Sequence, residues 1–485
     1  VLAGALLVGH SVRGSLRDLV LRRIGNTGHV VLSSGFFREE LAVELQACPV
    51  VMTQGFVSRQ SGGGRAGNVR VYGVDDRFWQ FHGIGSVNGP AGREALISRA
   101  LAAELGAAAG DTILIRVQRP SGVPLESLHG RKDDLATTLT PTVRAVLQRE
   151  QLGEFSLEAQ QGEVRAVFVP LKLLQREMEV GGRVNALLVS GGAPLEALLR
   201  SKVELDDLGL KLRVLQERNT IVLEADGGVL DGAKARAAME AARDLGLQPQ
   251  PVFTYLANAL RGGGREIPYS LVTAMDLPGQ KSAAAGAPPI LLNEWAARDL
   301  QVAVGDRITI DFVVWEDPGR LVPRTAEFEL ASIVPIETGD RDLAPVYQGI
   351  TDSDTLGDWD PPFPIDLRRV RPVDEEYWKK YRTTPKAFIP LDAGQRLWKS
   401  RYGALTSIRF TPASPDYARR LREKTDPLTM GIAVKDVRSE SLRASRGATD
   451  FGEYFVYFSF FLVVSALLLA ALFFKLSVEQ RAREV

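Results

Sequence analysis

The sequence predicts an α+β protein in which two similar domains stand in tandem on helical stalks that lead to a membrane. Three observations predict this: one block of sequence occurs twice, a long uncharged segment stands near the C-terminus, and a short apolar segment opens the chain. A chain of 485 residues has room for about three domains. Basic and acidic residues balance at 59 each, so net charge gives no general attraction to nucleic acid. The single cysteine, Cys48, excludes an internal disulfide and leaves the compartment open.

The repeated block reads ALISRALAAELGAAAGDTILI at 95–115 and ILLNEWAARDLQVAVGDRITI at 290–310. The two stretches align without a gap, and the Gly-Asp pair at 110–111 falls on the Gly-Asp pair at 305–306. Two copies of one long pattern indicate a duplicated structural unit.

Each copy of the block predicts a strand, a helix, a turn and a second strand. Ser98 and Asn293 follow short β-type runs and are good residues for capping the start of a helix. The Gly-Asp pair then predicts a turn, since glycine adopts positive φ without strain, and an alternating strand follows.

Further matched blocks occur in the same order along the chain. They pair HVVLSS at His29 with TIVLEA at Thr220, PVVMT at Pro49 with PVFTY at Pro251, SGGGR ending at Arg65 with RGGGR ending at Arg265, VYGVD ending at Asp75 with VTAMD ending at Asp276, and VRAVFVPLKLLQR ending at Arg176 with TPKAFIPLDAGQR ending at Arg396. This order predicts two homologous domains, at 29–200 and 220–412. The second carries an insertion at 351–381 that is rich in proline and charge and is expected to form a loop.

The segment Tyr454–Phe474 contains no charged residue and predicts a transmembrane helix. As a helix rising about 1.5 Å per residue it would cover roughly 30 Å, the thickness of a hydrocarbon core. A buried core helix is the alternative, but such helices rarely stay uncharged on every face. The apolar residues 1–9 are too short to span, and we expect them to be the outer end of a first transmembrane helix. The following segment is amphipathic and should end at Gly25.

Residues that carry chemistry are scarce, and we predict no catalytic, cofactor-binding or metal-binding residues. The four histidines lack metal-ligand spacing, and no Gly-Lys pair exists to form a phosphate-binding loop. The acidic run DSDTLGDWD resembles a calcium loop but has Leu356 and Phe363 at positions where ligands are needed. The glycine triplets are expected in hairpin loops, and Cys48 as a small buried side chain.

A family resemblance now becomes visible. The stretches VYGVD at 71–75 and REALISRALAAELGAAAGDTILI at 93–115 resemble the MacB-type periplasmic core, and LLLAALFFKLSVEQRAREV at 467–485 resembles the second transmembrane helix and cytoplasmic turn of FtsX-like ABC transporter permeases. The doubled core departs from the usual single one.

The resemblance implies a permease subunit of the bacterial inner membrane with its large domains periplasmic. It would couple ATP hydrolysis on a separate ATP-binding cassette subunit to movement of those domains, for export or extraction of a lipoprotein, peptide or small molecule. The lipid membrane, a second permease and an extracytoplasmic cargo or adaptor protein are the other implied partners; nucleic acid is not. Contact with the ATPase is expected at Ser477, Glu479, Gln480, Arg481 and Arg483. A membrane-anchored binding, scaffold or signalling module is the main alternative, and an anchored hydrolase a lesser one.

We expect the chain to be divided into eight segments. They are the end of a first transmembrane helix at 1–9, a stalk helix at 10–28, the first repeat at 29–200, a linker at 201–219 that would act as a hinge, the second repeat at 220–412, a second stalk helix at 413–450, a transmembrane helix at 451–475 and the start of a cytoplasmic coupling segment at 476–485.

Overall fold

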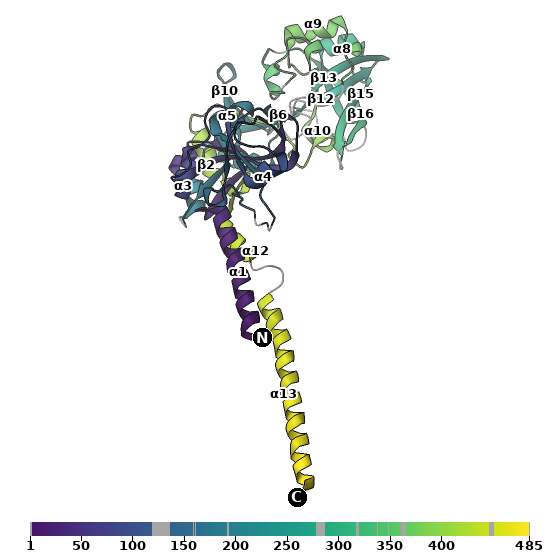
Figure 1. Ribbon diagram of the computed structural model, residues 1–485. Coiled ribbons are helices and arrows are strands. Elements are labelled where there is room, and N and C mark those ends of the chain that lie inside the picture. The colour runs from purple at the N-terminus through teal and green to yellow at the C-terminus, as the bar shows by residue number, and fades with distance from the viewer. Residues whose placement is uncertain are drawn as a thin grey trace.

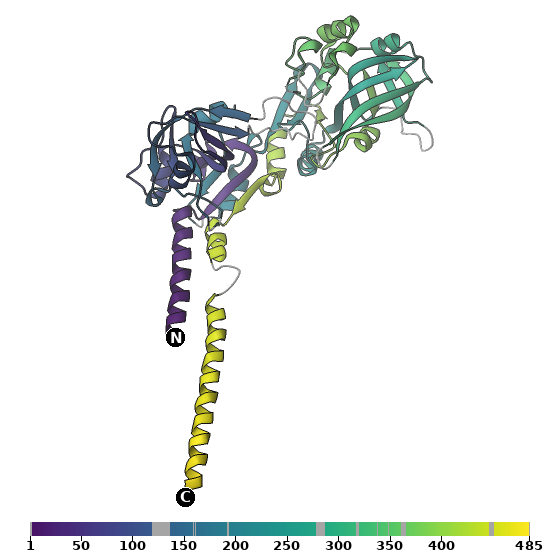
Figure 2. The same ribbon diagram turned by 45° about the vertical axis from the view of Figure 1, so that its right-hand side comes forward.

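The computed structural model contains two folded bodies and two helical stalks (Figure 1). It describes residues 2–118, 136–158, 160, 162–191, 194–277, 287–316, 320–336, 338–347, 349–359, 365–445 and 451–484. Helices and strands are mixed along the chain, as the α+β prediction requires. The first body lies directly above the stalks, and the second body lies beyond it (Figure 2).

The helices and strands have the following bounds. The helices are α1 (Leu2–Ile24), α2 (Leu41–Glu44), α3 (Asp76–His82), α4 (Arg99–Leu105), α5 (Leu171–Glu177), α6 (Leu195–Lys202), α7 (Gly232–Asp244), α8 (Glu294–Leu300), α9 (Pro372–Tyr381), α10 (Leu391–Trp398), α11 (Tyr417–Lys424), α12 (Val437–Ser445) and α13 (Phe451–Glu484). The strands up to the middle of the chain are β1 (His29–Arg38), β2 (Cys48–Arg59), β3 (Arg65–Val74), β4 (Glu94–Ser98), β5 (Ile113–Gln118), β6 (Ala136–Leu139), β7 (Thr142–Leu147), β8 (Ala166–Pro170), β9 (Arg183–Val189) and β10 (Leu210–Leu215). The remaining strands are β11 (Thr220–Ala225), β12 (Gln248–Gly262), β13 (Arg265–Met275), β14 (Pro289–Asn293), β15 (Arg307–Glu316), β16 (Arg320–Val334), β17 (Ala387–Pro390), β18 (Ser407–Thr411) and β19 (Ile432–Lys435).

Each body is built on one mixed β-sheet. The first body, by which we mean the ten-stranded sheet and its helices, has the strand order β19-β1-β9-β2-β3-β8-β4-β7, with β5 paired to β2 and β6 paired to β5. The second body is built on nine strands in the order β10-β11-β18-β12-β13-β17-β14-β16-β15, with β15 also paired to β12. When the first order is read from β19 and the second from β10, strands formed by matched sequence blocks occupy the same positions in the two sheets.

Strand register also agrees between the two sheets. Leu96 faces Phe168 in the antiparallel pairing of β4 with β8, and Leu291 faces Phe388 in the pairing of β14 with β17. The register shifts at the same place in both sheets, between Ala95 and Leu96 and at the corresponding residues of β14. A bulge that recurs at one position marks the same local bend in both bodies.

The repeated block folds as the sequence indicates. The side chain of Ser98 accepts a hydrogen bond from the N–H of Leu101 at the start of α4, and that of Asn293 accepts one from Ala296 at the start of α8. Gly110 and Gly305 adopt φ of 96° and 97°, which favours glycine. The predicted caps and turns are confirmed. The glycine triplets lie in the β2–β3 and β12–β13 hairpin connections, also as expected.

Apolar packing divides the molecule unevenly. The largest buried cluster joins the first body to the part of the second body nearest the stalks, and includes Leu187 and Leu199 together with Leu223, Ala238 and Leu421. The far part of the second body has a separate core, which contains the β12–β13 hairpin and α8. Cys48 is buried in the first body, and burial raises the pKa of its thiol to about 12.

The insertion at 351–381 is not the open loop that its prolines suggested. Its described residues include α9, and Trp359 and Trp378 are buried edge to face with ring centroids 4.9 Å apart. The hydroxyl of Tyr377 accepts a hydrogen bond of 2.8 Å from the side-chain amide of Asn293. The prediction was wrong because the buried aromatic side chains of Trp359, Tyr377 and Trp378, which supply large apolar surfaces, outweigh the charge and proline content of this stretch.

The predicted linker and second stalk also need correction. Residues 201–219 contain β10, which is an integral strand of the second sheet, so they are not a free linker. Residues 413–450 do not form one stalk helix, because Pro427 and Gly431, with φ of 101°, interrupt the helix and β19 follows. Only α12 serves as the second stalk.

Helix α13 is continuous through the predicted boundary at 475. Its segment Ser459–Arg481 is, among the described residues, the one helix with the length and composition to cross a membrane. Leu467 and Leu468 are 65% and 62% exposed, so they remain open to their surroundings within the part of the chain that the structure describes. An apolar surface this large and this exposed needs lipid or another protein around it.

Candidate functional site at the stalk root

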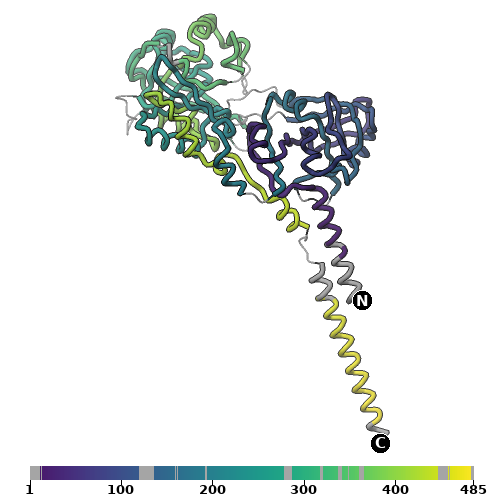
Figure 3. Tube along the Cα trace, turned by 90° about the vertical axis from the view of Figure 1, so that its left-hand side faces the viewer, coloured from purple at the N-terminus to yellow at the C-terminus, as the bar shows by residue number. Residues whose placement is uncertain are grey.

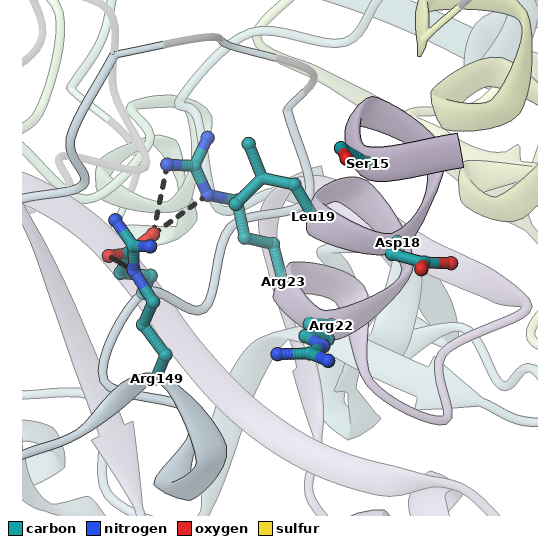
Figure 4. Close-up of a pocket in the computed structure, with 7 residues that line it drawn as sticks. Ser15, Asp18, Leu19, Arg22, Arg23 and Arg149 are labelled. Atoms are coloured by element: carbon teal, nitrogen blue, oxygen red, sulfur yellow. Dashed lines mark hydrogen bonds and ion pairs between the residues drawn. The ribbon is translucent and has the colours of Figure 1, made fainter. Parts of the chain in front are cut away.

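Both stalks meet the first body at one place, which we call the stalk root. It consists of residues 15–28, residues 149–158, Gln160, Gly162, His82 and the start of α12. Helices α1 and α12 contact each other below it and leave the body side by side (Figures 2 and 3). A pocket of about 260 Å³ lies beside α1, lined by Ser15, Asp18, Leu19, Arg22, Arg149 and Glu154 together with Arg23 (Figure 4).

Arg23 anchors α1 to the first body. Its side chain is only 5% exposed, and its guanidinium donates to the carboxylate of Glu154 at 3.2 Å and 2.9 Å. It also donates to the carbonyl oxygens of Gln160 and Gly162, at 2.5 Å and 2.8 Å. A buried charge is tolerated only when it is paired and hydrogen-bonded, and Arg23 meets both conditions.

The carboxylate of Glu154 accepts hydrogen bonds from both Arg23 and Arg149. Burial opposes ionisation of this carboxyl group, but the hydrogen bonds from Arg149 and Arg23 outweigh burial and lower its pKa. The carboxylate therefore stays charged and keeps the buried guanidinium neutralised at physiological pH.

The end of α1 is fixed by a second contact. The helix stops at Gly25, whose φ of 56° suits glycine, and the N–H of Asn26 donates to Nδ1 of His82 at 3.0 Å. His82 is packed against Phe78 and Phe155, and burial lowers its pKa to about 3. A neutral imidazole with Nδ1 as acceptor is the form that this hydrogen bond requires.

The second stalk begins within hydrogen-bonding distance of the first. The N–H of Arg438 donates to the carbonyl of Gly28 at 3.1 Å, and the side chain of Asp436 caps α12 by accepting from the N–H of Ser439 at 2.9 Å. Val437 and Ser441 are buried. The residue before β1 is thus hydrogen-bonded directly to the start of α12.

The residues expected to contact an ATPase lie far along α13 from the stalk root. Ser477, Glu479, Gln480 and Arg481 are exposed on the helix, and the side chain of Arg483 lies outside the described residues. The structure brings none of the described four to another charged group of this chain. Their predicted role stays a prediction.

Sequence reasoning missed the residues that build the stalk root. Glu154 is distant from Arg23 in the chain, and no local pattern connects them. The spacing of His82 in the sequence gives no sign of its role as a hydrogen-bond acceptor for the turn after α1. The end of α1 at Gly25 was predicted, and it is confirmed.

Part of the chain is similar to a known protein family. Residues 1–208 match the family described as the MacB-like periplasmic core domain. A comparison with curated proteins gives no match. Among solved structures, the periplasmic region of MacB from Actinobacillus actinomycetemcomitans is 10% identical over 36% of this chain and 81% of that chain, with a TM-score of 0.23. The extracellular domain of the ABC-type transporter YknZ from Gram-positive bacteria is 10% identical over 36% of this chain and 89% of that chain, with a TM-score of 0.21. These structural scores are low, so the family assignment depends on the sequence match.

Proposed function

We propose that this chain belongs to the permease subunit of an ABC transporter, because its residues 1–208 match the MacB-like periplasmic core domain. In this proposal the permease couples ATP hydrolysis on a separate subunit to movement of its extracytoplasmic bodies. The result is export or extraction of a lipoprotein, a peptide or a small molecule. The chain itself makes and breaks no covalent bond.

One observation carries the mechanical part of this proposal. Both stalks are continuous with neighbouring strands of one sheet, since α1 leads into β1, and β19, which pairs with β1, leads into α12. Motion of two membrane helices relative to each other would therefore act on a single pair of strands. Such direct attachment favours transmission of movement over a passive anchor.

The second body is, in our proposal, a second copy of the first. Support comes from the common strand order and from the shared register of Leu96 with Phe168 and of Leu291 with Phe388. The second copy extends the moving surface away from the membrane.

We place α13 across the bacterial inner membrane and both bodies on its periplasmic side. The apolar start of α1 would then lie at the periplasmic surface of that membrane. The parallel course of α1 and α13 away from the first body supports this placement (Figure 1). Two permeases would associate around the partner ATPase, and a cargo or adaptor protein would meet the bodies.

Stimulation of the ATPase tests this function. The chain, within its full-length permease, is purified with its ATPase in lipid, and the hydrolysis rate is measured for Arg481→Glu with Arg483→Glu. If these arginines contact the ATPase, charge reversal should lower stimulation about tenfold or more, since a lost interfacial charge pair costs about 1.5 kcal/mol or more.

The matched control reverses two charges far from the membrane, in Arg307→Glu with Arg368→Glu. These side chains are 81% and 91% exposed, and their ion pairs are surface pairs that contribute little. Full stimulation in the control and its loss in the test variant support the permease. Equal stimulation in both variants counts against the contact, and absence of any stimulation favours an anchored scaffold or signalling module.

A further inference from the structure

The two bodies exchange an edge strand with each other. Strand β10 follows β9 of the first body in the chain, yet it pairs with β11 of the second, with Leu212 opposite Leu223. Strand β19 follows β18 of the second body, yet it pairs with β1 of the first, with Val31 opposite Val434. Each sheet is therefore completed by a strand from the other half of the chain.

The two exchanged strands are reached through the same succession of elements. In the first half, α6 is followed by a short 3₁₀ helix at Asp206–Leu208, by Gly209 with φ of 65° and by β10. In the second half, α11 is followed by a 3₁₀ helix at Pro427–Thr429, by Gly431 with φ of 101° and by β19. Strands β19 and β10 are then the edge strands of their sheets, beside β1 and β11 respectively.

Buried side chains on the preceding helices match as well. Leu195 and Leu199 are the buried residues of α6, and Tyr417 and Leu421 are those of α11. The two pairs stand at the same spacing before Gly209 and Gly431, respectively. The segments are thus equivalent parts of the two bodies and not unrelated edge strands. This step rests on the duplication proposed above.

The chain passes from the first body to the second between α6 and β10, which we call the first crossing, and back between α11 and β19, which we call the return crossing. Charged contacts hold the first crossing in place. The buried carboxylate of Asp207 accepts from the backbone N–H of Arg38 at 2.9 Å and from its guanidinium at 3.0 Å and 2.8 Å. Arg183 of the first sheet reaches Asp206 at 2.7 Å and Asp226 of the second body at 3.7 Å. These bonds hold the chain against the first body immediately before it enters the second sheet.

The return crossing runs beside the first. The guanidinium of Arg422 on α11 donates to the carbonyl of Val203 at 3.1 Å, and Arg200 on α6 forms an ion pair with Asp426 at 3.2 Å. The two crossings are therefore bonded to each other as well as to their sheets. The continuous core that contains Leu199 and Leu421 lies around them.

We infer that reciprocal exchange of β10 and β19 interlocks the two bodies and makes the β1–β19 ladder the common attachment of both stalks. Rotation of one body against the other would have to break two edge ladders at once. Residues 201–219 therefore do not act as a hinge, contrary to the expectation from sequence. The second body follows the first as one unit when the stalks move.

Disulfide trapping in the full chain tests the exchange. In a Cys48→Ser background, the exchanged arrangement predicts cross-links for Leu32→Cys with Ala433→Cys and for Lys211→Cys with Glu224→Cys, which face each other in the two ladders. The unexchanged arrangement predicts them instead for Leu32→Cys with Lys211→Cys and for Glu224→Cys with Ala433→Cys. Each variant is oxidised under mild conditions and the linked peptides are identified by mass spectrometry.

We expect nearly complete cross-linking in the first two variants and less than a tenth as much in the other two. The reverse pattern, or equal cross-linking in all four, would overturn the exchange. Thermal unfolding of the reduced proteins shows whether each variant folds. If the cysteine pair in one ladder disturbs folding, cross-linking of the pair in the other ladder decides whether the strands are exchanged. The cross-link pattern does not depend on the ATPase, so failure of the exchange and failure of the permease function are distinguishable.

A second measurement tests the rigid attachment. If β1 and β19 stay together while the stalks move, the oxidised Leu32→Cys, Ala433→Cys protein stimulates its ATPase as well as the reduced protein does. A loss of stimulation that reduction restores would mean that this ladder opens during the cycle, and the attachment would not be rigid.

Discussion

Gly25 and His82 are in direct contact where the stalk α1 ends. A Cβ atom added at Gly25 would overlap the imidazole ring of His82, and the N–H of the next residue, Asn26, donates to Nδ1 of that ring. The position also has a φ of 56°, in the region that side chains other than glycine rarely adopt. Two independent constraints thus require glycine at the joint between stalk and body.

Replacing Gly25 should loosen that joint. Gly25→Ala combines positive φ with a steric overlap, and we expect it to lower the free energy of unfolding by about 2–4 kcal/mol. Chemical denaturation of the purified chain measures the change. The matched control is Gly14→Ala in the same helix, where an added Cβ meets nothing within 4 Å. Alanine there should be neutral or stabilising by up to about 1 kcal/mol, and an equal loss in both variants would contradict the account.

The stalk root should weaken in mild acid through His82. Burial lowers the pKa of this side chain to about 3, whereas the unfolded chain titrates near about 6.5. Below pH 6.5 the unfolded state therefore binds a proton that the folded state does not, so the free energy of unfolding falls by up to about 1.4 kcal/mol per pH unit. The loss continues as the pH approaches the folded pKa.

The comparison with His82→Gln isolates this effect. Glutamine keeps an acceptor near the N–H of Asn26 but does not titrate. Few carboxyl groups change charge between pH 6.5 and 5. In this range the free energy of unfolding should depend less steeply on pH in the variant than in the wild type, and the difference in slope should correspond to the uptake of about one proton on unfolding. Parallel stability curves for the two proteins would show that His82 does not control the acid response.

The buried pair of Arg23 and Glu154 should be costly to break. The two side chains are 5% and 13% exposed, and Glu154→Ala leaves the guanidinium buried without its counter-charge. We expect a loss of about 3–5 kcal/mol in the free energy of unfolding. The double variant Arg23→Met with Glu154→Leu should recover most of this loss, because no buried charge remains.

An exposed ion pair provides the control for this prediction. Glu196 on α6 is 63% exposed and lies 3.6 Å from Arg200. Glu196→Ala should change stability by no more than about 0.5 kcal/mol. If Glu154→Ala were as mild as Glu196→Ala, Arg23 would not anchor the stalk.

Local patterns in the sequence predict a substantial part of this architecture. The caps at Ser98 and Asn293, the turns at Gly110 and Gly305 and the end of α1 each depend on neighbouring residues, so they can be recognised without a structure. The exposed apolar helix α13 is recognisable for the same reason, since its composition alone marks it.

The parts that the sequence did not predict depend on contacts between distant segments. Arg23 meets Glu154, and Tyr377 meets Asn293, only after the chain has folded. The helical patterns on either side of Pro427 and Gly431 predict one helix at 413–450, and they mask the interruption that these two residues cause. Strand exchange has no local signature, since an edge strand fits either sheet equally well by its pattern.

The central claim is that α13 crosses the membrane and holds both bodies outside the cytoplasm, and site-specific labelling tests it most directly. In the Cys48→Ser background, Glu196→Cys lies on the bodies and Gln480→Cys lies at the far end of α13, and both positions are exposed. Intact right-side-out spheroplasts are treated with a membrane-impermeant maleimide. The account predicts that Glu196→Cys reacts at once and that Gln480→Cys reacts only after detergent opens the membrane. Labelling of Gln480→Cys in intact spheroplasts, or protection of Glu196→Cys until detergent is added, would contradict it.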